Sequence, residues 1–226
     1  MLEYPCPKVD ISIEGIEAPG VTVIAAWNLA DSILLGADTR ATSDDYAVSS
    51  NKLYQLQAYP LMWGGSGDMD LVMDFKARVD EYDLSEGTWS ALIANARKDV
   101  AFLNKTKRQH LEDAGIKAEK HDLFGVLLAG YLKGEPNIVE ITESGVPHER
   151  LQQGFEAIGS GAAHFAVARW TLQYWHQFQG RTLHWNESTF QFLLAVAAEM
   201  DPRSGQPLRC YRITDGGITE LRRRST

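Results

Sequence analysis

The feature that most constrains the fold is the order in which strand-like and helix-like apolar segments alternate along the chain. Two runs rich in apolar and β-branched residues come first, at 22–27 and 32–38, and a short polar turn joins them. Together they predict a hairpin of buried strands. Apolar residues at helical spacing follow in 71–82 and 89–103, each behind polar residues that favour a helix N-terminus. We therefore expect two core-facing helices after the first strands.

The second half of the chain continues this alternation. The charged stretch 105–121 loses the helical periodicity and predicts a loop. Beyond it we expect three strands, two helices and a terminal hairpin, at 123–131, 137–142, 155–158, 162–178, 188–200 and 208–221. We assign the strands before the glycine-rich segment 64–68 to a first sheet and the three after residue 122 to a second. The expected class is α+β, with layers of sheet and helix.

Size and composition indicate one compact domain that follows an extension. The chain has 226 residues, of which 44% are hydrophobic and 23% charged, so it can bury a sizeable core. Residues 1–21 contain three prolines and no stretch long enough for a stable helix. We therefore expect an N-terminal extension at 1–21 and a folded domain at 22–226.

Charge and cysteine content narrow the classes of function. Lys and Arg number 22 against 30 Asp and Glu, and this net charge of -8 disfavours binding to nucleic acid or to acidic membranes. We see no signal peptide and no apolar run long enough to span a membrane. Cys6 and Cys210 form neither a disulfide framework nor a zinc-binding spacing, and the six histidines show no metal-ligand pattern. We expect a cytoplasmic protein with no metal and no cofactor.

Two glycine-rich segments, 64–68 and 159–161, each precede a predicted helix. Such a segment can present backbone amides to an anion at a helix N-terminus. It can also be an ordinary tight turn, or form an oxyanion hole if a nucleophile lies nearby. The residues alone leave these alternatives open.

Six short sequence segments occur along the chain in an order that is typical of one protein family. They are Thr22 at the start of a strand, Asp38–Thr42, Lys52–Leu56, Gly65–Gly67, Ile158–Gly161 and Asp201–Gly205. With these segments the chain resembles, from Thr22 to Leu221, the β-type subunits of proteasomes, including the bacterial HslV-like peptidases. The resemblance implies the N-terminal nucleophile (Ntn) hydrolase fold, a four-layer αββα sandwich of two stacked, mainly antiparallel sheets flanked by helices.

The resemblance makes Thr22 the nucleophile of a threonine-type endopeptidase. A threonine hydroxyl is a weak nucleophile at neutral pH and needs a base, which its own α-amino group can supply because the pKa of such a group is about 7.7–8. Thr22 must therefore become the N-terminus. We expect its Oγ to attack the carbonyl carbon of Val21 and to expel residues 1–21 as a propeptide.

The resemblance also assigns charged groups beside Thr22. It makes Lys52 a fixed positive charge that lowers the pKa of the neighbouring amine and hydroxyl, and it makes Asp38 the group that holds Lys52. Without the resemblance, Asp38 and Lys52 would be an ordinary ion pair between adjacent strands.

By the same resemblance, Ser160, Asp201 and Ser204 form a hydrogen-bonded set that orients the Thr22 amine. Taken alone, Asp201–Gly205 has the composition of a turn. The assignment of these three residues therefore depends on the family and not on their spacing.

Substrate contacts are implied as well. The resemblance gives the Gly65 amide to the oxyanion hole, and the backbones of Thr42 and Gly65 to pairing with an extended peptide. We expect Trp63 and Tyr54 to narrow the pocket for the side chain before the scissile bond, which would favour small or modest residues. Packing of these two aromatic residues in the core is the alternative.

One residue departs from the family pattern, because Val21 stands where a glycine usually precedes the nucleophile. A β-branched residue stiffens the bend that self-cleavage requires. The expected partners are a peptide or unfolded protein substrate, further copies of the chain in a homo-oligomeric ring, and an ATPase unfoldase. Two alternatives stay open: a non-catalytic assembly subunit that keeps residues 1–21, and an Ntn amidase acting on a small amide.

Overall fold

The computed structural model describes residues 22–42, 47–49, 51–56, 59–84, 87–119, 122–149, 154–201, 204–205 and 207–221. The helices are α1 (Met69–Val79), α2 (Trp89–Asp113), α3 (Ala162–Phe178) and α4 (Glu187–Met200). The strands are β1 (Ile24–Asn28), β2 (Ile33–Asp38), β3 (Arg40–Thr42), β4 (Ala47–Ser49), β5 (Leu53–Gln55), β6 (Leu61–Gly67), β7 (Phe124–Leu132), β8 (Glu135–Ile141), β9 (Pro147–Glu149), β10 (Phe155–Ile158), β11 (Leu208–Thr214) and β12 (Gly217–Glu220).

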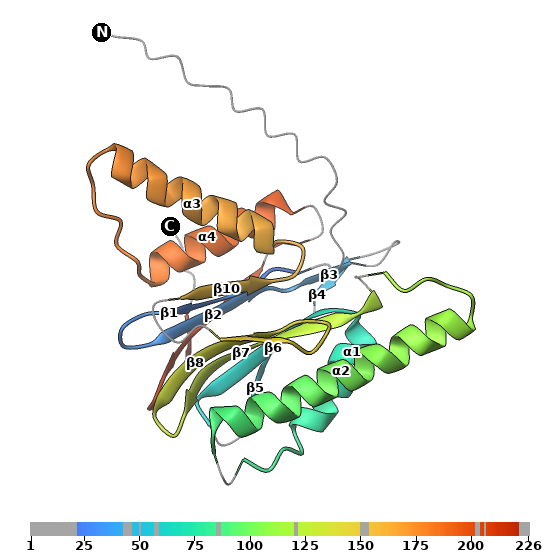
Figure 1. Cartoon of the computed structure of the whole chain (residues 1–226). Coiled ribbons are helices and arrows are strands. Elements are labelled where there is room, and N and C mark those ends of the chain that lie inside the picture. The colour runs from blue at the N-terminus through green and yellow to red at the C-terminus, as the bar shows by residue number, and fades with distance from the viewer. Residues whose placement is uncertain are drawn as a thin grey trace.

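Two five-stranded antiparallel sheets lie face to face between two pairs of helices (Figure 1). The first, here called the β1 sheet, has the strand order β10-β1-β2-β11-β12. The second, the β6 sheet, has the order β5-β6-β7-β8-β9. Helices α3 and α4 cover the outer face of the β1 sheet, and α1 and α2 cover that of the β6 sheet. The α+β class and the layering predicted from the sequence are confirmed.

Strand β1 consists almost entirely of apolar residues, because both of its faces are covered. Side chains alternate between the two faces of a strand. Ile24 and Ala26 point into the core between the two sheets, whereas Ala25 and Trp27 pack under α3 and α4. Because both faces of the sheet are covered, every residue of β1 is buried.

Helices α1 and α2 begin behind polar residues, as the sequence predicts. The Asp68 side chain accepts hydrogen bonds from the amides of Asp70 and Leu71 at the start of α1, and Thr88 accepts one from Ala91 at the start of α2. The prediction that 105–121 is a loop is wrong for 105–113, because α2 continues to Asp113, and is confirmed for 114–119, which form no helix or strand. The last turns of α2 are mostly exposed, so no core face imposes an apolar period on them.

The assignment of strands to sheets is also corrected. Strand β10 pairs with β1 and not with β7 or β8, whereas β5 and β6 belong to the sheet of β7. The segment 64–67 continues strand β6 instead of forming a loop. Periodicity reports that a segment is a strand, but it does not report which distant strand is its partner.

Two further features concern the helices. Among the described residues, no helix is both long and apolar enough to cross a membrane. Helix α4 lies very close to β2, since a Cβ atom placed on Gly36 would lie 2.7 Å from Leu194 Cδ2 and 3.0 Å from Phe190 Cε1, both in α4. Helix α4 can therefore pack this closely on the β1 sheet only because residue 36 is a glycine and has no side chain.

This close approach gives a first prediction. We expect Gly36→Ala to destabilise the protein by about 1–3 kcal/mol, because the added methyl group overpacks the core. Urea denaturation followed by circular dichroism measures the loss. Gly216→Ala is the matched control, because a Cβ atom there would meet only Thr214 Oγ1 at 3.8 Å. Equal stability of the two variants would contradict the packing of α4 on β2.

Candidate active site

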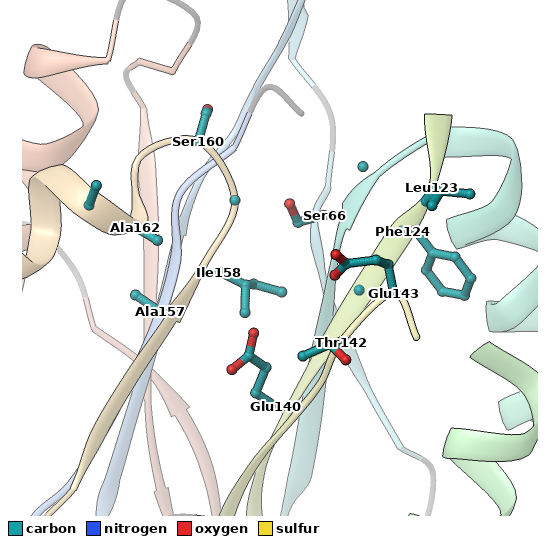
Figure 2. Close-up of a pocket in the computed structure, with 14 residues that line it drawn as sticks. Ser66, Leu123, Phe124, Glu140, Thr142, Glu143, Ala157, Ile158, Ser160 and Ala162 are labelled. Atoms are coloured by element: carbon teal, nitrogen blue, oxygen red, sulfur yellow. The ribbon is translucent and has the colours of Figure 1, made fainter. Parts of the chain in front are cut away.

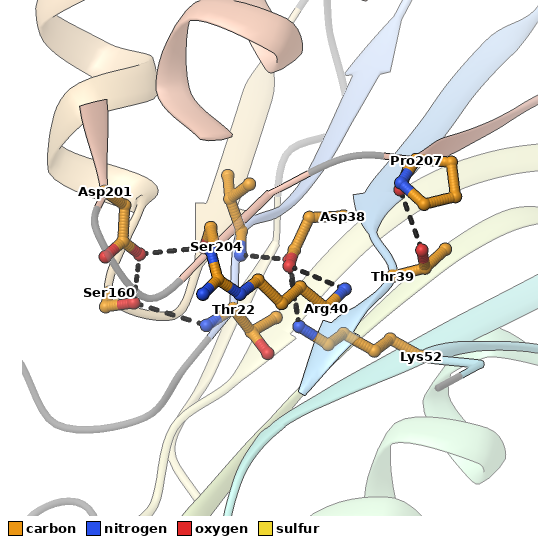
Figure 3. A network of polar contacts seen from close by, with 10 residues as sticks. Thr22, Asp38, Thr39, Arg40, Lys52, Ser160, Asp201, Ser204 and Pro207 are labelled. Carbon is orange, nitrogen blue, oxygen red and sulfur yellow. Dashed lines mark hydrogen bonds and ion pairs between the residues drawn. The ribbon is translucent and has the colours of Figure 1, made fainter. Parts of the chain in front are cut away.

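The residues singled out from the sequence gather where four strands of the β1 sheet begin or end. At the start of β1, Ile24 pairs with Ala37 near the end of β2 and with Ile158 at the end of β10. Asp38, at the end of β2, pairs with Leu208 at the start of β11. The segments that flank these pairs therefore lie together at one end of the sheet (Figure 3).

A directed chain of hydrogen bonds runs from Thr22 to a buried carboxylate. The Thr22 backbone N–H donates to Ser160 Oγ at 3.2 Å, and Ser160 Oγ donates to Asp201 Oδ2. Ser204 Oγ donates to the same Asp201 oxygen at 2.8 Å. Because both serine protons are committed to the carboxylate, Ser160 faces the Thr22 nitrogen as an acceptor. Thr22, Asp201 and Ser204 are buried, so water competes little for these bonds.

Asp38 and Lys52 form an ion pair beside this chain. Lys52 Nζ lies 3.0 and 2.9 Å from the two carboxylate oxygens, and both side chains are almost fully buried. The amides of Val23 and Arg40 donate to the same carboxylate at 2.9 and 3.2 Å. Asp38 thus connects Lys52 to the residue next to Thr22. The expected ion pair is confirmed, but it joins the two sheets and not adjacent strands of one sheet.

Burial sets the protonation behaviour of this pair. Desolvation raises the pKa of the Asp38 carboxyl and lowers the pKa of the Lys52 amine, while the attraction between the two groups opposes both shifts. The charge of Asp201 also acts to raise the pKa of Lys52, which shows that the two clusters share one electrostatic environment.

Glycines let the backbone come close to Thr22. Gly161 N–H donates to the Thr22 carbonyl oxygen at 3.1 Å. Gly159 has φ of +92°, and a Cβ atom there would lie 2.1 Å from the same oxygen. Of the alternatives for this glycine segment, a tight turn is confirmed, and it holds Ser160 against Thr22.

The structure adds Thr39 and Pro207, which the sequence did not single out. Thr39 donates to the Pro207 carbonyl oxygen from its amide at 3.0 Å and from its hydroxyl at 2.9 Å. These bonds fix the end of β2 to the segment that follows Asp201 and Ser204. Thr39 is adjacent to Asp38 in the sequence, but a buried threonine there gives no signal that distinguishes it from a strand residue.

The expected substrate-binding residues lie in strands β3, β5 and β6. Gly65 is buried in β6, where a Cβ atom would lie 2.8 Å from Val72, and Thr42 ends β3. Trp63 is fully buried and stacks on half-buried Tyr54 with a centroid distance of 4.6 Å. Core packing therefore accounts for Trp63. Val21 lies outside the described residues.

The site must be interpreted from its geometry. No protein-family model and no curated protein matches the chain. Within the part of the chain that the structure describes, no group of three or more His, Cys, Asp or Glu residues could hold a metal ion. The site combines a threonine just before a strand, a buried lysine beside it, and a serine–aspartate pair whose serine oxygen accepts a hydrogen bond from the threonine nitrogen. We call the hydrogen bonds from Thr22 through Ser160 to Asp201 the relay.

The buried ion pair gives a second prediction. We expect Lys52→Met to cost about 3–5 kcal/mol of folding stability at pH 8, because it removes the cation from a buried carboxylate. Asp38→Leu combined with Lys52→Met should lose less, since neither charge of this pair then remains buried. Urea denaturation measures both. Lys76→Met is the control, because the Lys76–Asp80 pair is exposed and contributes less than about 1 kcal/mol.

The pH dependence of the same variant tests the cause. Burial already raises the pKa of Asp38 above 3.8, and removing Lys52 raises it further. A group with a raised pKa in the folded state stabilises the fold at low pH, and that stability is lost as pH rises through the raised value. The deficit of Lys52→Met should therefore be smaller at pH 5 than at pH 8. A deficit that does not depend on pH would contradict this account.

Proposed function

We propose that the chain is an Ntn hydrolase, a threonine-type endopeptidase of the proteasome β type with Thr22 as its nucleophile. The observation that carries the proposal is the buried relay from the Thr22 nitrogen through Ser160 to Asp201, with Lys52 held beside it by Asp38. Two antiparallel sheets between helical layers fit the Ntn fold. The free and buried Cys210 fits a reducing compartment, for which we propose the cytoplasm.

The first step would release the nucleophile. Thr22 Oγ attacks the carbonyl carbon of Val21, the bond between that carbon and the Thr22 nitrogen breaks, and an ester forms. The proton of the hydroxyl passes to the nitrogen as it leaves. Water then hydrolyses the ester, which frees residues 1–21 with a new carboxylate and leaves Thr22 with a free amine.

Turnover would use that amine as the base. It takes the proton from Oγ, Oγ attacks the substrate carbonyl, and the amine returns the proton to the departing peptide nitrogen, which leaves an acyl-enzyme ester on Oγ. Water then hydrolyses this ester, which releases the second product as a carboxylate and returns the proton to Oγ. Lys52 stabilises negative charge that develops on Oγ, and the Gly65 amide is proposed to stabilise the oxyanion. The Thr42 and Gly65 backbones would hold the peptide as an added strand. Because Trp63 is fully buried, Tyr54 is the aromatic residue that we propose to narrow the pocket for the side chain before the scissile bond.

Thr22 gives the direct test. We expect Thr22→Ala to abolish both cleavage at the bond between Val21 and Thr22 and hydrolysis of fluorogenic peptides, because no hydroxyl remains to attack. Thr22→Ser should keep both activities, since it keeps the hydroxyl and the amine. Intact mass, N-terminal sequencing and peptide hydrolysis are the measurements. Thr219→Ala, at an exposed position of β12, is the matched control.

The outcomes separate the alternatives. A wild-type chain that keeps residues 1–21 and hydrolyses nothing overturns the proposal and favours a non-catalytic assembly subunit. A chain that begins at Thr22 but hydrolyses only small amides favours an Ntn amidase. Retention of peptidase activity in Thr22→Ala would remove Thr22 from the mechanism.

The outer face of α3 supports the proposed self-assembly. It exposes a row of apolar side chains at helical spacing, Val167, Trp170, Tyr174 and Phe178, with exposed fractions of 44%, 65%, 70% and 76%. Monomeric proteins rarely expose contiguous apolar patches larger than a few hundred Å². Helix α3 contains no Asp or Glu, so a second copy can approach this face without repulsion between like carboxylates.

This face predicts an assembly defect. We expect the triple change Trp170→Gln, Tyr174→Gln and Phe178→Gln to shift the protein to smaller species, because it removes the apolar area that a second copy would cover. Sedimentation velocity and light scattering measure the shift. The double change Ile116→Gln and Val146→Gln, at similarly exposed apolar positions elsewhere, is the control. An unchanged assembly would show that α3 is not the interface.

A further inference from the structure

A cavity of about 320 Å³ opens beside the candidate active site (Figure 2). It lies between the ends of β6, β7 and β8 on one side and the junction of β10 and α3 on the other. Gly159 and Ser160, which contact Thr22, form part of its wall. We call it the Glu140 cavity. Its size, at the lower end of ligand sites, is suited to one side chain or small group.

Glu140 is an unusual residue for its place in the fold. It is opposite Leu127 in the ladder between β7 and β8, so it shares the face of the sheet that forms the core between the two sheets. Its side chain is 23% exposed, and its carboxylate lies 3.4 Å from Nδ1 of half-exposed His148. Burial, together with the nearby charge of Glu156, raises the pKa of Glu140. A carboxylate on this face contributes no apolar packing and suits a cationic group beside it.

A second carboxylate is held at the same cavity by a rigid turn. The buried Asn104 side chain donates to the carbonyl oxygens of Phe124 and Glu143 at 2.8 and 2.9 Å. Gly145 N–H closes the turn by donating to the Thr142 carbonyl oxygen at 2.8 Å. Figure 2 shows the Glu143 side chain directed toward Ser66 and the Glu140 side chain directed toward Ile158. The backbone that carries Glu143 is therefore fixed.

The rest of the lining is apolar or hydroxyl-bearing. Ala157, Ile158 and Ala162 form an apolar wall, and no Lys, Arg or His of the described residues lines the cavity. Lysine and arginine combine an apolar stem with a cationic head, and they commonly bury the stem against apolar surface. A charged head also forms stronger hydrogen bonds with carboxylates than a neutral group does. The chemistry of the lining therefore matches a basic side chain.

We infer that the Glu140 cavity is a substrate subsite that binds a lysine or arginine side chain of the peptide, with Glu140 and Glu143 at its charged end. The inference rests on the proposed peptidase function. It adds a specificity beyond the hydrogen bonds from Thr22 through Ser160 to Asp201, because Glu140 and Glu143 are not members of that chain of hydrogen bonds.

Matched peptide pairs test it. In each pair, one lysine at a chosen position on either side of the scissile bond is replaced by norleucine, which has a similar length and no charge. We expect the wild-type protein to hydrolyse the lysine peptide about tenfold faster, in kcat/KM, at one of these positions. In Glu140→Gln combined with Glu143→Gln the ratio should fall to about one, while kcat/KM for the norleucine peptide stays within about twofold.

The controls keep the two proposals separate. Glu112→Gln combined with Glu199→Gln removes two exposed carboxylates elsewhere and should keep the lysine preference. Each single cavity variant, Glu140→Gln or Glu143→Gln, provides the comparison if the double variant does not fold. Equal hydrolysis of lysine and norleucine peptides at every position, or a preference that survives in the cavity variants, overturns the subsite but not the peptidase. A protein that hydrolyses neither peptide overturns both.

Discussion

The Asp38 carboxylate is the interaction on which the arrangement at this end of the molecule depends. It binds Lys52, directly before strand β5 of the β6 sheet, and it accepts hydrogen bonds from the amides of Val23, directly before β1, and of Arg40, at the start of β3. A buried carboxylate is costly unless such partners compensate for its lost hydration. Because its partners come from both sheets, the sheets must stack in the register that brings them together. The position of Lys52 beside Thr22 follows from that register.

The second cluster depends on the direction of its hydrogen bonds. Asp201 can only accept when ionised, so Ser160 and Ser204 both point their protons at it. Ser160 is left with lone pairs for the Thr22 nitrogen. The Gly159–Gly161 turn keeps that serine in place, since a side chain at Gly159 would collide with the Thr22 carbonyl. The orientation of Thr22 therefore depends on Asp201 and the two glycines as well as on Ser160, which makes the direct contact.

The sequence predicted most elements of the fold but not how they pair. Helices α3 and α4 and the two hairpins lie where apolar periodicity placed them, because each buries a face that leaves a pattern. Strand β10 belongs to the β1 sheet and strand β6 to the other sheet, which is the reverse of the prediction. No local pattern reports this, since the pairing of distant strands depends on the whole chain. The same holds for the site: Thr22, Asp38, Lys52 and Ser160 came from a resemblance, while Thr39 and Glu140 look like ordinary strand residues until the strands are assembled.

The structure also bears on what release of residues 1–21 would change under the proposed function. With Val21 still attached, the Thr22 nitrogen already donates to Ser160, and the Asp38–Lys52 pair is already closed. Cleavage would then alter the chemistry of one atom more than the geometry around it. An amide nitrogen has no basic lone pair, whereas the freed amine does, and it can keep its hydrogen bond to Ser160.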